Sequence, residues 1–276
     1  MTGETIVVRP DPEACTLTAA EEIASVLVEV VAQRGVVHWA TTGGSTPASI
    51  YRHLAGPPLR DAVPWERVQL WWGDDRFVPA DHKLSNVHVA TSDLLDVGAL
   101  SGQSGTGGSG ADVGAGRTAG APIPADNIHA VPAGQAIGLG EGPAWAAERY
   151  AAELVSHGPP FTDGVPAFDL VLIGMGPDGH VLSVFPNSPT FDAREPVLDV
   201  PAPTHVEPHV ARVTLHPRIL EVAARVIVVA HGAAKAGTIA DVFGEERDER
   251  RWPAQLARRA GATWILDEAA AAGLPR

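Results

Sequence analysis

Short apolar runs alternate with helical patterns along most of the 276-residue chain. The runs hold many β-branched residues, which is typical of strands buried on both faces of a sheet. The alternation predicts an α/β fold in which a mainly parallel sheet carries helices on both faces. We expect strands at Thr5–Arg9, Val36–Ala40, Val68–Trp72, Leu170–Gly174, Arg225–Ala230 and Thr263–Leu266, a shorter one near Ile128–Val131, and helices at Thr18–Gln33, Pro143–His157 and Ala233–Phe243.

One segment interrupts this pattern. Residues 101–120, SGQSGTGGSGADVGAGRTAG, are rich in Gly, Ser and Ala and nearly lack large apolar side chains. Such a segment buries too little surface to offset the entropy lost on ordering. It is either a flexible surface insertion or a domain linker. Because motifs on its two sides point to one site, we favour an insertion within a single domain over residues 1–276.

Composition narrows the class of protein. The chain has one cysteine, Cys15, so no internal disulfide can form, as is usual in a reducing cytosol. We expect no signal peptide, because the N-terminus lacks a basic segment followed by an apolar run, and no run is long enough to span a membrane. The net charge of −13 disfavours nucleic-acid binding. A phosphorylated ligand would need a locally basic site, or one built from backbone amides.

The first candidate site follows the expected strand Val36–Ala40, where residues 41–47 read TTGGSTP. Gly43 and Gly44 let backbone N–H groups approach an anion, and Ser45 and Thr46 add hydroxyl donors before a helix. This arrangement fits a phosphate cradle. An ordinary strand-to-helix turn with a Ser/Thr cap fits the motif equally well.

The second motif, DDRFVP at residues 74–79, follows the strand that ends at Trp72. Ligands of open α/β sheets bind at this end of the strands. Arg76 could pair with phosphate, with Asp74 beside it, or both acids could hold Arg76 in a structural ion pair. The motif alone slightly favours the ion pair.

The third motif is GMGPDGH at residues 174–180, directly after a buried strand. It matches a dinucleotide-binding G-x-G-x-x-G formally, but Pro186 and Pro189 leave no room for the long helix that motif requires. The glycine turn instead presents Asp178 and His180 together. Histidine is suited to accepting a proton near neutral pH, so His180 is our candidate general base.

The fourth pair of motifs contributes basic side chains. Arg212 lies in ARVTL, and Lys235 lies in GAAK after the strand Arg225–Ala230. A cation at a helix start is disfavoured by the helix dipole unless an anion compensates, although simple solvation of Lys235 is the alternative. His205, His209 and His216 lie in polar or Pro-rich stretches and are interpreted as surface residues. The sequence has no serine-esterase elbow and no zinc-binding motif, so we expect no metal.

Taken in order along the chain, these motifs resemble the 6-phosphogluconolactonase family. The resemblance spans nearly the whole chain and rests on TTGGSTP, DDRFVP followed by Ser85-Asn86, GMGPDGH with SVFP, RVTL and GAAK. It implies a modified Rossmann-like fold with a small additional lobe, related to glucosamine-6-phosphate deaminase and ribose-5-phosphate isomerase. Asp75 stands where that family usually has Glu.

The resemblance also implies a function. It implies hydrolysis of 6-phospho-D-glucono-1,5-lactone in the oxidative pentose phosphate pathway, in the cytoplasm, without cofactor or metal. We expect a small-molecule phosphosugar lactone as the partner, no nucleic acid or membrane, and a monomer or weak oligomer. The candidate catalytic residues are His180 and Asp178, and those for substrate or phosphate binding are Gly43, Gly44, Ser45, Thr46, Asp74, Arg76, Arg212 and Lys235.

Two alternatives stay open. A glucosamine-6-phosphate deaminase-like isomerase shares the Gly-Gly-x-Thr-Pro and Asp-Gly-His motifs. It follows them with Asn-Glu-Pro, whereas residues 181–186 here read VLSVFP and lack that carboxylate. A non-catalytic sugar-phosphate sensor would keep the phosphate cradle. Sequence leaves undecided whether Asp178 orients His180 or holds a basic side chain.

Overall fold

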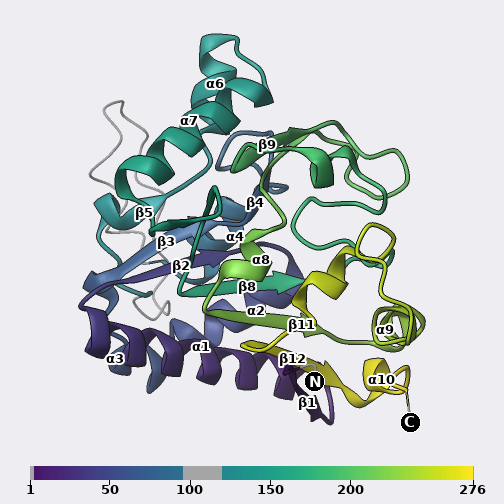
Figure 1. Ribbon diagram of the computed structural model, residues 1–276. Helices are drawn as coiled ribbons and strands as arrows, with labels where there is room; N and C mark the ends of the chain where they lie inside the picture. The colour runs from purple at the N-terminus through teal and green to yellow at the C-terminus, as the bar shows by residue number, and fades with distance from the viewer. Residues whose placement is uncertain (1–2, 96–119, 276) are drawn as a thin grey trace.

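The computed structural model describes residues 3–95 and 120–275. Its centre is a seven-stranded sheet in the order β1-β12-β11-β8-β2-β3-β5, in which all neighbouring strands are parallel (Figure 1). The expected strands are confirmed, with small shifts at their ends. They are β1 (Thr5–Arg9), β2 (Val37–Thr41), β3 (Val68–Trp72), β5 (Ile128–His129), β8 (Leu170–Gly174), β11 (Arg225–Ala230) and β12 (Ala262–Asp267).

The longest helix shows how local sequence sets the boundaries. Helix α1 begins at Pro12 because the carboxylate of Asp11 accepts a hydrogen bond from the N–H of Ala14 at 2.8 Å, and it ends where Gly35 takes φ of 79°. The remaining helices are α2 (Ser45–Leu54), α3 (Leu59–Ala62), α4 (Asn86–Asp93), α6 (Ala133–Leu139), α7 (Pro143–His157), α8 (Ile219–Val222), α9 (Ala236–Val242) and α10 (Glu268–Ala271).

Side chains of single strands alternate between two helical layers, as a parallel sheet requires. In β12, Thr263 donates to Glu22 of α1, while the next residue, Trp264, packs edge-on against Phe243, which follows α9. On the α1 side, Trp39 of β2 packs against Tyr51 of α2. The expected helices on both faces are therefore confirmed.

A small lobe extends beyond the end of β3. It contains a three-stranded antiparallel sheet of β4 (Asp74–Arg76), β10 (Arg212–Leu215) and β9 (Val197–Val200), with α6 and α7 above it in Figure 1. A separate hairpin is formed by β6 (Phe161–Thr162) and β7 (Val165–Pro166). The hydroxyl of Tyr150, on α7, joins the lobe to the main sheet, since it lies 2.8 Å from the backbone N and 3.0 Å from the backbone O of Trp72.

The order of the strands positions a crevice. The chain runs from β2 outward to β3 and β5, then returns to place β8 on the opposite side of β2. The connections that leave β2 and β8 therefore diverge from neighbouring strand ends. In open α/β sheets such a reversal is where ligands bind.

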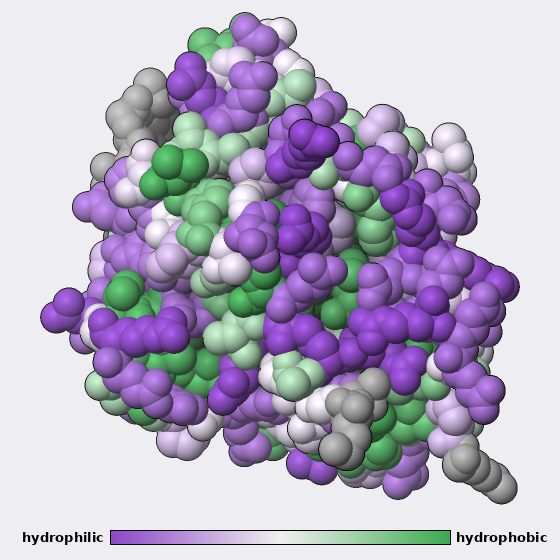
Figure 2. All heavy atoms as spheres, viewed as in Figure 1, coloured by the Kyte–Doolittle hydropathy of each residue, from purple (hydrophilic) through white to green (hydrophobic). Residues whose placement is uncertain are grey.

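The surface and the remaining segments of the chain give little further information on function. Figure 2 shows a face covered mostly by hydrophilic residues, with hydrophobic ones in small groups. Within residues 3–95 and 120–275, no helix has the length and apolarity needed to cross a membrane. The predicted flexible insertion lies outside the described residues except for Gly120, and the single domain over residues 1–276 stays a prediction.

Replacing Tyr150 with Phe should destabilise the fold by about 1–3 kcal/mol, because both hydrogen bonds to the buried backbone of Trp72 are lost without replacement. Urea unfolding monitored by circular dichroism measures this change. Val155→Ala, on an exposed position of the same helix, is the matched control and should change the free energy of unfolding by less than about 0.5 kcal/mol. Equal stabilities of wild type and Tyr150→Phe would contradict the anchoring role.

Candidate active site

A polar cavity of about 150 Å³ opens at the carboxyl ends of β2 and β8, where the chain order reverses. It collects residues from both neighbouring strand ends and from the small lobe. The lining residues are Thr42, Gly43, Asp74, Arg76, Asn86, Gly174, Met175, Gly176, His180, Leu182 and Arg212. Five predicted site residues, Gly43, Asp74, Arg76, His180 and Arg212, therefore meet in one cavity.

The turn after β8 holds His180 and Asp178 in one fixed relation. The N–H of Gly176 donates to the carbonyl of His180 at 2.8 Å, which closes the turn. A Cβ atom at Gly176 would overlap the His180 ring, so only glycine fits there. Nδ1 of His180 lies 2.6 Å from Oδ1 of Asp178, whereas Nε2 makes no hydrogen bond to any described residue.

The environment of Asp178 keeps it ionised. Burial raises the pKa of its carboxyl group, but hydrogen bonds and charge from His180, with a further hydrogen bond from His205, outweigh burial and leave the pKa below its usual value. An ionised carboxylate can only accept, so Nδ1 of His180 carries the hydrogen in this pair. When the ring is neutral, its Nε2 atom therefore has a lone pair that can accept a proton.

The two cavity arginines face each other without an acidic partner. Antiparallel pairing of β4 with β10 sets Arg76 directly opposite Arg212. Neither guanidinium lies within 4.0 Å of a carboxylate of the described residues, and the buried Nε atom of each lacks a hydrogen-bond partner. Burial lowers the pKa of Arg212, and Arg76 adds to this effect while Asp74 opposes it. An anion placed between the two side chains would relieve this arrangement.

Uncharged acceptors supply the contacts that hold these arginines. Nη1 of Arg76 donates to the carbonyl of Leu84 at 3.0 Å and to Oδ1 of Asn86 at 2.7 Å. Nη2 of Arg212 donates to the carbonyl of Pro208 at 3.0 Å. The side chains are thus oriented while their charge stays available for a ligand.

The two acids of the second motif bind other partners. Asp74 accepts from Ser183 at 2.6 Å, and Asp75 accepts from the N–H of Asn86 at 2.6 Å and from Ser85 at 2.8 Å. The interpretation in which they form a structural ion pair with Arg76 is therefore wrong. Asp75, the residue that replaces the usual Glu, instead ties β4 to the start of α4 and lies outside the cavity wall.

The other predicted binding residues lie outside the cavity lining. Helix α2 begins at Ser45 after Gly44, and no side chain caps it; Thr46 instead lies 2.8 Å from Nε2 of His231. The Ser/Thr-capped turn is thus not the observed arrangement. Gly43, which does line the cavity, packs so closely on Asn86 that a Cβ atom would overlap it.

Lys235 connects two of the loops at this end of the sheet. It lies in a 3-10 turn, Ala233–Lys235, that precedes α9, so the predicted helix Ala233–Phe243 is split. Its Nζ donates to the carbonyl of Met175 at 2.7 Å. Burial lowers the pKa of Lys235, and Asp178 opposes that shift. Lys235 is therefore half-buried and bonded to the protein, which excludes simple solvation.

Sequence reasoning misjudged or missed several histidines. His216, expected at the surface, is buried; its Nε2 lies 3.1 Å from the carbonyl of Ala193, a contact formed across the small lobe. His205 and His209 are exposed as expected, yet Nε2 of His205 lies 3.1 Å from Oδ2 of Asp178. His231, beside Thr46, carried no motif that could have indicated it.

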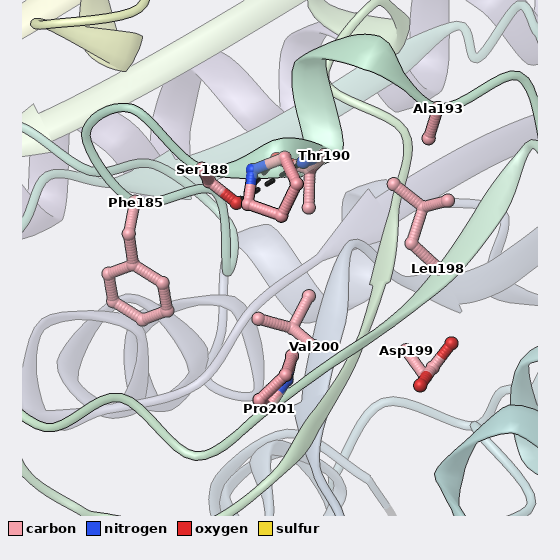
Figure 3. Close-up of a pocket in the computed structure, with 9 residues that line it drawn as sticks. Phe185, Ser188, Thr190, Ala193, Leu198, Asp199, Val200 and Pro201 are labelled. Atoms are coloured by element: carbon pink, nitrogen blue, oxygen red, sulfur yellow. Dashed lines mark hydrogen bonds between the residues drawn. The ribbon is translucent and has the colours of Figure 1, made fainter.

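A second pocket adjoins Phe185 but has different chemistry. It measures about 380 Å³ and lies between the segment Ser188–Ala193 and β9, with Leu198, Val200 and Pro201 on its wall (Figure 3). Its lining contains no Lys, Arg or His, and the hydroxyls of Ser188 and Thr190 bond each other. A phosphate therefore fits the smaller polar cavity better. In the part of the chain that the structure describes, no group of three or more His, Cys, Asp or Glu is arranged to hold a metal ion.

The sequence and the fold also match those of known proteins. A family model described as "Glucosamine-6-phosphate isomerases/6-phosphogluconolactonase" matches residues 10–265. The chain belongs to this family. Within it, the chain is 33% identical over 273 residues to a 6-phosphogluconolactonase of Streptomyces coelicolor, with 98% of this chain and 95% of that protein covered.

Solved structures extend the likeness. 6-Phosphogluconolactonase from Trypanosoma brucei is 26% identical, with a TM-score of 0.80 and 100% of both chains covered. A monomeric glucosamine-6-phosphate deaminase is 15% identical, with a TM-score of 0.71 and 98% of this chain and 99% of that one covered. The second likeness shows the fold alone, and it confirms the expected relation between this fold and that of the deaminases.

Asp75 gives a testable dependence of stability on pH. Burial raises the pKa of Asp75 to about 6, against hydrogen bonds from Asn86, Ser85 and Arg76. The unfolded chain has a carboxyl pKa of about 3.9, so between about pH 4 and pH 6 the folded state binds the additional proton. Wild type should lose up to about 3 kcal/mol of stability as the pH rises through this window.

Asp75→Asn should lack this loss, because its side chain cannot ionise and its oxygen can still accept from the backbone. Urea unfolding at intervals from pH 4 to pH 7.5 measures both proteins. Asp126→Asn, at an exposed position, is the control and should follow wild type. Parallel curves for wild type and Asp75→Asn would show that the buried carboxyl is not the titrating group.

Proposed function

We propose that this protein hydrolyses 6-phospho-D-glucono-1,5-lactone to 6-phospho-D-gluconate, in the oxidative pentose phosphate pathway of the cytoplasm, as a monomer or weak oligomer. One observation carries the proposal. His180, with its Nε2 free of hydrogen bonds to described residues, lines a cavity together with two arginines that lack acidic partners. The relative from Streptomyces coelicolor, which bears the same activity in its name, supports it.

The proposed reaction begins with water held by Nε2 of His180. As the water oxygen forms a bond to C1 of the lactone, its proton moves to Nε2, and Asp178 stabilises the resulting imidazolium through Nδ1. The carbonyl oxygen becomes an oxyanion that nearby N–H donors stabilise. The bond from C1 to the ring oxygen then breaks, and the proton on Nε2 transfers to that oxygen. One water is consumed and the free acid is formed.

Positioning of the phosphate supplies the rest of the rate enhancement. Arg76 and Arg212 provide paired donors in the cavity, and the uncapped start of α2 provides backbone N–H groups next to it. Holding the phosphate fixes C1 relative to the base. The attack on C1 then becomes effectively unimolecular, because the reacting groups are already in position. The site is thereby locally cationic in a protein of net charge −13.

The deaminase alternative is disfavoured by the side chain that precedes Pro186. Deaminase relatives of the resemblance have a carboxylate there, and this chain has Phe185. Its ring centroid lies 4.8 Å from that of His180 and 5.7 Å from the guanidinium carbon of Arg212. An apolar ring cannot move protons between the two carbons of an opened sugar.

A coupled assay on freshly made lactone, corrected for spontaneous hydrolysis, tests the proposed function. The expected result is a rate well above the uncatalysed one, with no turnover of glucosamine 6-phosphate in a parallel assay. A sensor would bind 6-phosphogluconate without accelerating hydrolysis. Ammonia release from glucosamine 6-phosphate would instead support the isomerase and overturn the lactonase proposal.

His180→Ala should lower kcat by about 10²–10⁴-fold, the usual contribution of a positioned general base. The variant should still bind 6-phosphogluconate, as measured by isothermal titration calorimetry, because the phosphate contacts remain. His157→Ala, an exposed histidine at the end of α7, is the control. Turnover close to wild type in His180→Ala would exclude this histidine as the base.

Arg212→Ala should mainly raise KM, by about 10–100-fold, since charge-assisted hydrogen bonds to a buried anion contribute about 1.5–3 kcal/mol. Steady-state kinetics measures the effect, and thermal unfolding checks that the lobe stays folded. Arg250→Ala removes a surface arginine paired with Asp192 and serves as the control. A selective fall in kcat with unchanged KM would instead place Arg212 at the reacting carbon.

A further inference from the structure

The carboxylate of Asp178 is shared by two imidazoles. Its Oδ1 atom lies 2.6 Å from Nδ1 of His180, and its Oδ2 atom lies 3.1 Å from Nε2 of His205. The Asp178 side chain is 20% exposed and that of His205 is 52% exposed. The three side chains form a His–Asp–His chain that runs from the cavity to the surface.

His205 reaches this position from a segment remote in sequence. It lies on the loop 201–211 that joins β9 to β10, and the loop is bound at its far end by the bond from Arg212 to the carbonyl of Pro208. The ring of Phe185 contacts both imidazoles, with its centroid 4.8 Å from that of His180 and 5.5 Å from that of His205. His180 and His205 therefore share two neighbours, the Asp178 carboxylate and the Phe185 ring.

The second hydrogen bond has a geometric consequence. A carboxylate held by one oxygen can rotate about its terminal torsion, which has a broad energy profile. Bonds at both oxygens fix the carboxylate plane, and with it the direction in which Oδ1 holds Nδ1 of His180. Phe185 also borders the apolar pocket, in which it lies across from Val200 and Pro201 (Figure 3).

A surface histidine beside an acid need not have a function. Half-exposed ion pairs contribute little to stability, and many contribute nothing measurable. His205 could therefore be a surface histidine that happens to meet an acid. The two interpretations differ in what they predict for His180, because only a positioning role transmits the loss of His205 to the orientation of the base.

We propose that His205 is a positioning residue for the base: it holds Asp178 through Oδ2 so that Oδ1 keeps the His180 ring aimed at the reacting water. This inference rests on the proposed lactone hydrolysis for its kinetic readout. It goes beyond that function by assigning a role to the loop 201–211, which brings the residue to the site.

The test compares three variants by steady-state kinetics on the lactone. His205→Ala should lower kcat about fivefold with KM unchanged, the factor expected for a partly exposed hydrogen bond to a charged group. His205→Gln, whose side-chain amide can donate from nearly the same place as Nε2, should restore kcat to within about twofold of wild type. His209→Ala removes a neighbouring histidine that bonds Pro203 within the same loop, and it should leave both constants unchanged.

A double-mutant cycle separates positioning from a general loss of loop structure. In an Asp178→Asn background, His205→Ala should change kcat by less than about twofold, because the coupling passes through that carboxylate. A full fivefold loss in that background would overturn the proposal. So would a kcat for His205→Ala equal to wild type, or an equal loss in His209→Ala.

A measurement that needs no turnover keeps the inference separate from the proposed function. Nitrogen-15 NMR shifts of His180 report which ring nitrogen carries the proton. In wild type and His205→Gln we expect the Nδ1–H form to dominate, and in His205→Ala a mixture of both tautomers. If the protein hydrolyses no lactone, the proposed function fails, and these spectra alone then test whether His205 positions the His180 ring. Identical spectra for wild type and His205→Ala would then refute the positioning role.

Discussion

The polar cavity depends on keeping two guanidinium groups, one buried and one half-buried, charged and close together without an ion-pair partner for either. Register between β4 and β10 sets Arg76 and Arg212 opposite each other, which costs free energy in an empty site. The fold accommodates this by binding the carboxylates of Asp74 and Asp75 to hydroxyl and amide groups, and by holding the arginines with carbonyl and amide oxygens. Neutral dipoles of the protein thus orient both guanidinium groups and leave their charge available to bind an anion.

The main sheet and the small lobe contribute different residues to the site. Divergence of the chain at β2 and β8 places a glycine-rich turn and the His180 turn side by side, and both come from rigid buried strands. The lobe adds the arginines and the loop 201–211 from the other direction. Tyr150 links the two parts, because its hydroxyl bonds the backbone of Trp72 at the end of β3. Small shifts of the lobe relative to the main sheet would change the distance between the arginines and His180.

Local sequence was enough to predict the parallel sheet, because each strand is an apolar run bounded by its own glycine or proline. It also indicated the His180 turn, since Gly176, Asp178 and His180 interact within a few residues. What it could not indicate are contacts set by register or by long loops. The pairing of Arg76 with Arg212 depends on strands more than a hundred residues apart. The burial of His216 and the reach of His205 to Asp178 depend on how the segments around β9 and β10 cross the lobe.

The two cavity arginines lie in a protein of acidic net charge, which has a consequence for the end of the catalytic cycle. Opening the lactone creates a new carboxylate, so the product carries one more negative charge than the substrate. The arginines attract the phosphate equally in both, whereas the chain as a whole, with net charge −13, repels the more highly charged molecule more strongly. The long-range electrostatic field therefore slows the association of substrate somewhat and speeds the dissociation of product.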